Sequence, residues 1–437
     1  MAALVIFMAL SMVGYAMVSK RLATTSITGP MVFVALGLVA AWTSAIDVNA
    51  ENVVTVVDVV LQATLILVLF TDAAALHFSS WRKDAELPGR LLGIGLPLTI
   101  ALGALIAAVL FTDLSIWEAA IIGAIIAPTD AALGQAVISN PRVPRRIRQA
   151  LDIESGLNDG VSLPFVLIFI GLAEESEGTG AVLTFVREIG VAVAVGVVVG
   201  FIGGWLVVKA SQAEWMGHAW GSIAVVAIAV TAFVVADVSG GSGFIATFVA
   251  GLAYGNATRD RIRRTEALAA HLGLAMVQVS FLLFGVLVLE PALGSLSWQV
   301  VLMAVLALTV VRMGPVAFSM IGVNMRPATV LYMGWFGPRG LATIVFAALV
   351  ITEADLPGTG TITTVAAVTV GLSVLLHGVT AYPGSQLYAD WYAAHDDPSQ
   401  LAESKPVHRK LSRSRADHFL PTEPAGAPTS SPPDTPT

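Results

Sequence analysis

Apolar segments long enough to cross a bilayer recur along almost the whole chain. A membrane-spanning helix needs about 20 mainly apolar residues, and fewer where it is broken. Hydrophobic residues make up 56% of the sequence and charged residues only 12%, against about 25% charged in a typical soluble domain. We therefore predict an all-α polytopic membrane protein with thirteen spans, whose approximate limits are 2–18, 28–43, 52–77, 89–111, 115–137, 147–173, 181–208, 219–236, 241–256, 266–289, 296–320, 328–351 and 360–382.

The loops between these spans alternate in charge. Basic loops hold Lys20 and Arg21, then Arg82, Lys83 and Arg90, four arginines between 142 and 148, Lys209, four arginines between 259 and 264, and Arg326. The loops between them are acidic. The positive-inside rule then places the N-terminus outside and the C-terminus in the cytoplasm, in agreement with an odd number of spans.

The last fifty residues differ in composition from the rest. We expect 386–437 to form a cytoplasmic tail whose first part is basic and lies on anionic lipid. Its end, 421–437, is rich in Pro, Ser and Thr and is predicted to be disordered. The chain has no cysteine, which excludes disulfides and metal–thiolate sites. We expect no cofactor and no nucleic-acid partner.

The fifth span contains a proline followed by a threonine and an acid, Pro128, Thr129 and Asp130. Proline removes a backbone donor and clashes with the preceding turn, so we predict a broken helix of the kind that coordinates ions in transporters. The alternative is a simple proline kink in which Asp130 caps a helix start.

The sixth span carries the most polar stretch within the membrane part, at 151–160. On a helix Ser155, Asp159 and Ser162 share one face, because they are four and three residues apart. A carboxylate with hydroxyls offers hard oxygen ligands for a small cation. Charged residues inside a membrane are costly and usually serve an ion or proton path. Glu154 and Asn158 share the neighbouring face, where the acid could instead be interfacial.

The twelfth span holds Gly-Pro-Arg-Gly at 337–340, a second predicted break that carries a cation. Arginine stays protonated in proteins, and a buried arginine must be paired. Glu154, Asp130 and Asp159 are its candidate partners. We favour Glu154, because a pair between Glu154 and Arg339 leaves the other two acids free to titrate.

The two breaks occupy matching places in two halves of six spans, spans 1–6 and 8–13, and have opposite orientation. This pattern indicates an inverted repeat. Among the weaker signals, we interpret His377 as a hydrogen-bonded packing residue, Arg312 as a structural or inner-mouth residue, and Asp72 as an interfacial acid.

Three motifs together resemble the NhaP-type sodium/proton antiporters of the monovalent cation:proton antiporter superfamily. They are Ala-Pro-Thr-Asp at 127–130, Glu-Ser-Gly-Leu-Asn-Asp-Gly at 154–160, and Gly-Trp-Phe-Gly-Pro-Arg-Gly at 334–340. The resemblance covers nearly the whole membrane part and implies a transporter, not an enzyme, in the plasma membrane of a prokaryote. Its substrates would be sodium or lithium and protons, and it would contribute to pH homeostasis.

The resemblance also implies roles for individual residues. Asp159 would be the main carrier of cation and proton, Asp130 would assist it, and Ser155 and the Thr129 carbonyl would complete the sodium site. Asn158 would stand where electrogenic relatives carry a second aspartate, so one cation would exchange for one proton.

Further implications concern the architecture. Glu154 and Arg339 would form a buried structural pair, and the protein would be a homodimer. Within an antiporter domain of residues 1–385, a dimer part (about 1–80 and 219–289) would support a moving core (about 89–173 and 296–385).

Elementary electrostatics leads to the same mechanism. Burial raises the pKa of a carboxylate and a bound cation lowers it, so cation and proton compete for one acid. If only the loaded site crosses, competition alone gives obligatory exchange. Three alternatives are weighed: an intramembrane aspartyl protease, which lacks its Gly-x-Gly-Asp context; a cation channel, which needs a repeated filter; and a potassium/proton antiporter.

Overall fold

The computed structural model describes residues 2–22, 25–43, 51–76, 85–174, 179–258, 267–394 and 402–405. Within these ranges the regular structure is helical, without a β-strand. Among the described residues, eight helices are long and apolar enough to cross a membrane, and four shorter apolar helices accompany them. The predicted class, an all-α polytopic membrane protein, is confirmed. The number of crossings and the inverted repeat stay predictions.

The helices of the first half follow the predicted ranges closely. They are α1 (Ala2–Leu22), α2 (Gly29–Trp42), α3 (Glu51–Ala74), α5 (Glu86–Arg90) continuing through the π-helical turn η1 (Leu91–Gly95) into α6 (Leu96–Leu110), α7 (Ile116–Ile125), α8 (Gln135–Ile138) and α9 (Arg145–Glu174).

The second half begins with the long helix α10 and ends with the equally long α19. Its elements are α10 (Thr179–Gln212), α11 (His218–Val238), α12 (Gly243–Thr258), α13 (Ala267–Phe284) with η2 (Gly285–Leu289) and α14 (Glu290–Gly294), α15 (Trp298–Leu308), α16 (Val310–Ser319), α17 (Pro327–Trp335), α18 (Leu341–Glu353), α19 (Thr359–Ala393) and the 3₁₀ turn η4 (Ala402–Ser404).

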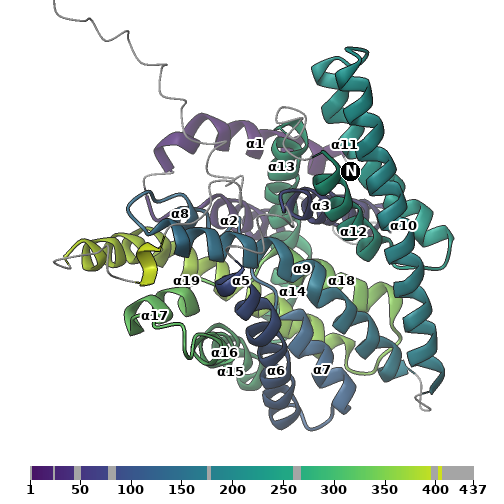
Figure 1. Cartoon of the computed structure of the whole chain (residues 1–437). Helices are drawn as coiled ribbons and strands as arrows, with labels where there is room; N and C mark the ends of the chain where they lie inside the picture. The colour runs from purple at the N-terminus through teal and green to yellow at the C-terminus, as the bar shows by residue number, and fades with distance from the viewer. Residues whose placement is uncertain are drawn as a thin grey trace, which may run out of the picture.

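Helix α9 lies in the middle of the molecule. Figure 1 shows α1, α2, α3, α12 and α13 on one side of it and α6, α7, α15 and α16 on the other. Helix α9 packs against α7 and α18 on one side and against α3, α10 and α12 on the other. Its 30 residues span about 45 Å at 1.5 Å per residue. Any polar side chain at its centre is therefore deep inside the bundle.

Two glycine contacts hold α12 close to its neighbours. A side chain at Gly251 would overlap the backbone of α3 at Phe70, and one at Gly200 of α10 would overlap α12 at Ala250. Small residues at a membrane-helix interface let the two backbones approach closely and gain dispersion contacts. Helices α3, α10 and α12 thus form a tightly packed wall beside α9.

Both predicted helix breaks are present. Helix α7 ends at Ile125 and α8 begins only at Gln135; α17 ends at Trp335 and α18 begins at Leu341. Each break follows from its proline and glycines. The proline cannot donate the i to i−4 hydrogen bond of a helix, and glycine adopts a non-helical backbone easily.

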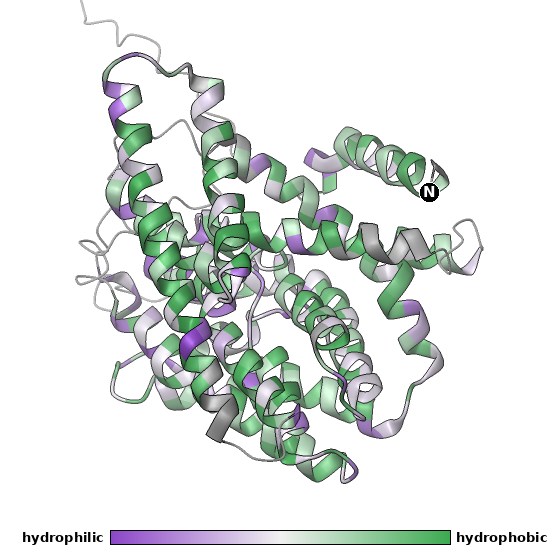
Figure 2. Ribbon diagram, turned by 90° about the vertical axis from the view of Figure 1, so that its right-hand side faces the viewer, coloured by the Kyte–Doolittle hydropathy of each residue, from purple (hydrophilic) through white to green (hydrophobic). Residues whose placement is uncertain are grey.

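The outer surface of the bundle is apolar, as a lipid environment requires. Figure 2 shows hydrophobic colour over most of the ribbon. Large apolar side chains such as Leu10, Val109 and Phe201 are 65%, 70% and 58% exposed. The basic loops at 82–83 and 259–264 and the tail beyond 405 lie outside the described residues.

The two ends of the bundle are distinguished by the ends of α19. We call the end near Ala393 and η4 the tail face, and the end near the start of α19 at Thr359 the far face. Helix α9 begins at the tail face, where Arg146 donates to the Ala402 carbonyl at 2.5 Å and to Glu86 at 2.7 Å. At the far face Glu118 of α7 accepts from the Gly358 N–H at 2.7 Å.

Candidate functional site

The two unwound segments, 126–134 and 336–340, cross each other at the centre of the bundle; we call this the crossing. The Asp130 N–H donates to the Pro338 carbonyl at 2.7 Å, and the Thr343 hydroxyl donates to the Ile125 carbonyl at 2.9 Å. Each break therefore satisfies backbone groups that the other leaves without helical partners.

Asp130 binds the start of α18. One carboxylate oxygen accepts from the Leu341 N–H at 2.8 Å and the other from the Ala132 N–H at 2.7 Å. A side chain at Gly340 would overlap this carboxylate, so the glycine makes the approach possible. A carboxylate at a helix N-terminus is stabilised by the helix dipole. Asp130 does cap a helix start, as the alternative predicted. The capped helix is α18, which belongs to the other broken span.

Arg339 performs the complementary task at the end of α7. Its side chain is fully buried, and Nη1 donates to the carbonyls of Ala127 at 2.5 Å and Pro128 at 3.1 Å. The Arg339 N–H also donates to the Ser373 hydroxyl at 2.7 Å. A cation at a helix C-terminus is favourable for the same reason that an anion is at the N-terminus.

The predicted pair between Glu154 and Arg339 is wrong. Glu154 instead forms a bidentate pair with Arg312 of α16, in which Nη2 lies 2.8 Å from Oε2, and both side chains are at least 95% buried. Gly337 lies directly on the Arg312 guanidinium, where any side chain would overlap it. Arg339 is held by the carbonyls that the break in α7 exposes, which leaves Glu154 to the second buried arginine.

The polar stretch of α9 meets the first break through hydroxyls. The hydroxyls of Thr129 and Ser155 lie 2.9 Å apart, and the Asn158 amide donates to the Thr129 hydroxyl at 2.6 Å. The Asn158 Oδ1 is buried without a hydrogen-bond partner among the described residues. Three of the five predicted site residues are thus joined directly.

Asp159 lies one helical turn beyond Ser155 on the same face of α9 and is 7% exposed. Pro164 leaves the carbonyl of Gly160, the residue after Asp159, without its helical donor, because a proline has no N–H to donate four residues back. Carboxylate, hydroxyl and carbonyl oxygens are the ligands that hard monovalent and divalent cations prefer. We call the face formed by Asp152, Gly156, Asp159 and Leu163 the stripe.

Exposure along the stripe is strongly asymmetric. Asp152 and Gly156, toward the tail face, are partly exposed, and Asp72 of α3 lies against Gly156. Beyond Asp159, Leu163 and Val166 are fully buried. The acids Asp152 and Asp72 therefore lie at the partly exposed end of the stripe, and Asp159 lies where the stripe becomes buried. This contact of Asp72 could not be predicted from the sequence, because nothing in one chain indicates which face of the third span meets the sixth.

His377 is hydrogen-bonded and packed, as predicted. Its Nε2 donates to the Trp335 carbonyl at 2.9 Å, and its ring lies on the Trp335 indole with centroids 5.1 Å apart. This holds the last turn of α17 just before the break.

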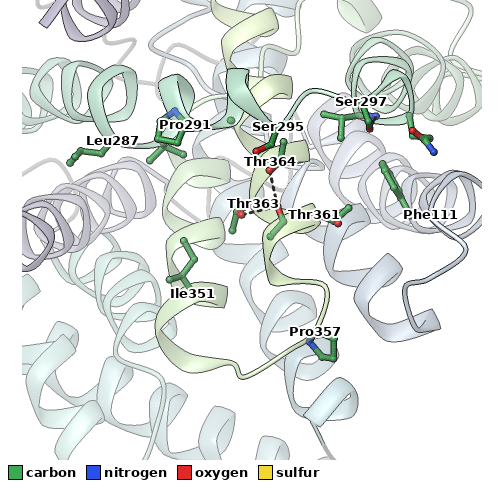
Figure 3. Close-up of a pocket in the computed structure, with 15 residues that line it drawn as sticks. Phe111, Leu287, Pro291, Ser295, Ser297, Ile351, Pro357, Thr361, Thr363 and Thr364 are labelled. Carbon is green, nitrogen blue, oxygen red and sulfur yellow. Dashed lines mark hydrogen bonds between the residues drawn. The ribbon is translucent and has the colours of Figure 1, made fainter. Parts of the chain in front are cut away.

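A separate cavity of about 710 Å³ opens between α18, α19 and the η2–α15 region (Figure 3). Hydroxyls and apolar side chains line it, among them Thr361, Thr364, Ser295, Leu287 and Ile351. No residue of the crossing or the stripe lines this cavity. It lies at the far face and is distinct from the buried polar centre.

A bundle of apolar helices with two crossed breaks and buried charged residues at its centre is typical of a helical membrane transporter. The family model for the transmembrane sodium/hydrogen exchanger matches residues 7–383. The chain belongs to this family, and the resemblance to NhaP-type antiporters is confirmed.

Curated relatives are identical to this chain at about a quarter of the aligned positions. The K⁺/H⁺ antiporter NhaP of Alkalimonas amylolytica is 25% identical over 323 residues, covering 72% of this chain and 55% of that protein. The K⁺/H⁺ antiporter NhaP2 of Shewanella oneidensis is 24% identical over 370 residues, with 82% and 62% covered. The Na⁺/H⁺ antiporter NhaG of Bacillus atrophaeus is 25% identical over 288 residues, with 62% and 52% covered. The chain thus spans a little more than half the length of these relatives.

A solved structure has the same fold over nearly its whole length. The sodium proton antiporter MjNhaP1 from Methanocaldococcus jannaschii, determined at pH 8, superposes with a TM-score of 0.74 at 19% identity, covering 88% of this chain and 97% of that one.

Proposed function

We propose that this protein exchanges sodium or lithium for protons across the plasma membrane, one for one, by alternating access. The observation that carries the proposal is the position of Asp159. It is a buried acid at the inner end of an acidic stretch of α9, one helical turn from Ser155, whose hydroxyl meets that of Thr129. Cation and proton compete for such a carboxylate. The activity is transport, with no chemical conversion and no cofactor.

Asp159, and not Asp130, is the carrier in this proposal. Both oxygens of Asp130 already accept backbone N–H groups, at 2.7 and 2.8 Å. A proton or cation on Asp130 would have to disturb the start of α18. Asp130 therefore assists by holding the crossing in place, which positions Thr129 beside Ser155. Ser155, the Thr129 hydroxyl or carbonyl, and the Asn158 Oδ1 complete the cation site.

Buried charge favours a one-for-one exchange. Two buried arginines, Arg312 and Arg339, lie in this region with two buried acids, Glu154 and Asp159, and with the partly exposed Asp130. With all five ionised, one negative charge remains, and one monovalent cation or one proton cancels it. Moving a net charge through the bilayer is costly. The neutral loaded forms would cross most readily.

The architecture expected from the resemblance belongs to this proposal. The dimer part (1–80 and 219–289) would stay fixed while the core (89–173 and 296–385) moves, in a homodimer with its tail in the cytoplasm. The packing of α12 against α3 and of α9 against α7 supports this division. In this arrangement the partly exposed end of the stripe, at Asp152 and Gly156, would face the cytoplasm.

Potassium is the second candidate substrate, because two of the similar relatives are K⁺/H⁺ antiporters. The two cations differ in radius, and the same ligands could hold either. The proposed mechanism is identical for both.

The test uses inside-out vesicles with an imposed proton gradient and a pH-sensitive dye. Sodium, lithium and potassium are added in turn to vesicles that contain the wild-type protein or Asp159→Ala. Proton movement triggered by sodium or lithium, and absent in the variant, is the expected result. A response to potassium alone would change the substrate and keep the mechanism. Full activity of Asp159→Ala, or no response to any cation, would overturn the proposal.

A further inference from the structure

A phenylalanine of the wall lies directly on α9 next to Asp159. The ring of Phe248, on α12, covers Gly160 so closely that any side chain at 160 would overlap it. Phe248 is only 9% exposed, and α12 packs against α9. Gly160 follows Asp159 and lies further from the tail face. The ring therefore lies next to Asp159, where the stripe becomes buried.

The ring is carried by α12, whose close packing prevents it from moving away from α9. Close backbone contacts hold α12 between α3, at Gly251 with Phe70, and α10, at Gly200 with Ala250. On the far side of the ring, the stripe continues with Leu163 and Val166, which are fully buried. An ion on Asp159 thus meets an aromatic ring and then apolar side chains in the direction of the far face.

A second glycine stands four residues before the first. Gly156 and Gly160 share one face of α9, because residues four apart lie one above the other. A methyl group at Gly156 would lie 3.3 Å from the Asp72 Cβ, which is tight but does not involve Phe248. Sliding α9 toward the far face by about 6 Å, four residues at 1.5 Å each, would bring Gly156 under the ring.

We propose that Phe248 is the barrier between Asp159 and the far face, and that its ring packs on Gly160 in one state and on Gly156 in the other. In the present state the ring occupies Gly160, and Asp159 is reached from the tail face. After the slide the ring occupies Gly156, and Asp159 has passed to its far side. This inference rests on the proposed function, because a barrier of this kind matters only if Asp159 serves both faces.

Replacing the two glycines by alanine is predicted to have opposite effects. Gly160→Ala places a methyl group against the ring in the present state and not in the other, so it favours access from the far face. Gly156→Ala is accommodated in the present state and overlaps the ring after the slide, so it disfavours that access. Phe248→Ala removes the barrier. Phe244→Ala is the matched control: an equally buried ring on the same helix, 8% exposed, which packs on Phe233.

The natural absence of cysteine allows a direct measurement. Ser162, fully buried and just beyond Asp159 on α9, is replaced by cysteine in each background. An impermeant methanethiosulfonate reagent is added to intact cells and, separately, to inside-out vesicles, with sodium present. A protease site placed after Lys405 identifies the preparation in which the tail is accessible; the other preparation reports the far face.

Labelling of the cysteine at 162 from the far face should rise at least tenfold in Gly160→Ala and Phe248→Ala. It should fall at least tenfold in Gly156→Ala and stay within twofold in Phe244→Ala. Equal shifts for the two glycine variants, or equal labelling in Phe248→Ala and Phe244→Ala, would overturn the inference. If Gly160→Ala does not fold, the double variant Gly160→Ala with Phe248→Ala, which has room for the methyl group, replaces it.

The labelling does not depend on transport. Opposite shifts in a protein that moves no protons would contradict the proposed function and keep the barrier. Transport that works, with labelling unaffected by Phe248→Ala, would contradict the barrier and keep the proposed function.

Discussion

The crossing and the stripe both place acids in the middle of a membrane protein, but they use them differently. In the crossing, Asp130 and Arg339 are bound to backbone groups at the ends of two half-helices. In the stripe, Asp159 projects from an intact helix on the same face as Ser155, at the buried end of a stretch that is partly exposed at Asp152 and Gly156. The first kind of charge replaces missing helical hydrogen bonds, and the second can exchange its partner.

This difference separates structural from functional charge by geometry alone. An acid whose two oxygens accept backbone N–H groups holds the fold, and its loss should appear in stability. An acid on a continuous helix whose carboxylate holds no helix end contributes less to the fold, and its loss should appear in transport. The following substitutions compare the two regions on both scales.

The largest effect is expected from Asp159→Asn. The amide cannot carry the proton or balance the cation, so the exchange rate should fall to background, by at least about a hundredfold. Because α9 is intact without this carboxylate, the melting temperature should change by less than about 3 °C. Asp152→Asn, two turns earlier on the same face, is the control and should keep at least a third of the rate. Rates come from the vesicle assay and melting temperatures from purified protein.

Separating the buried pair should have the next largest effect, on stability. Glu154→Gln leaves the Arg312 guanidinium buried without its counter-charge, at a cost of about 3–5 kcal/mol. The exposed pair of Arg142 and Asp390 is the control, since Arg142→Met should cost no more than about 1 kcal/mol. Denaturant titration of both variants measures the costs, and equal costs would show that burial of the pair is unimportant.

Asp130→Asn should lower stability less than Glu154→Gln does and should lower exchange less than Asp159→Asn does. The side-chain amide keeps one oxygen but turns an NH₂ group toward a backbone N–H, which leaves a buried donor unsatisfied at about 1–3 kcal/mol. Stability should fall accordingly, while exchange should remain above a tenth of the wild-type rate. Complete loss of exchange in a variant of unchanged stability would place Asp130 with the functional acids.

The smallest effect is expected from Ser155→Ala. It removes one neutral ligand and the hydrogen bond to Thr129, worth about 1 kcal/mol. The cation concentration for half-maximal exchange should rise about fivefold, and the maximum rate should be unchanged. Ser162→Ala, whose hydroxyl has no hydrogen-bond partner among the described residues, should leave both values within twofold.

The sequence was sufficient for the fold and for most of the polar centre. Hydrophobic length predicted where the helices lie, and Pro128 and Pro338 predicted both breaks, because proline acts locally. The i, i+4 spacing predicted that Ser155 and Asp159 share a face. These predictions depend on interactions within one helix, and the structure confirms the helices and the breaks.

Partners between helices could not be predicted in the same way. Two arginines, Arg312 and Arg339, compete for Glu154, and the sequence does not show which of them the carbonyls of Ala127 and Pro128 will hold. The contacts of Asp72 with Gly156 and of Phe248 with Gly160 depend on how three helices are rotated about their axes. An arginine in the middle of an apolar span was the one available signal for the true partner of Glu154.

Proton release on cation binding tests the central claim most directly. Sodium is added to the purified protein in weakly buffered solution, and the pH change is recorded for the wild type and for Asp159→Asn. Competition at Asp159 predicts up to one proton released per sodium bound in the wild type, declining as the starting pH rises, and none in the variant. Sodium binding without proton release, or unchanged release from Asp159→Asn, would contradict the account.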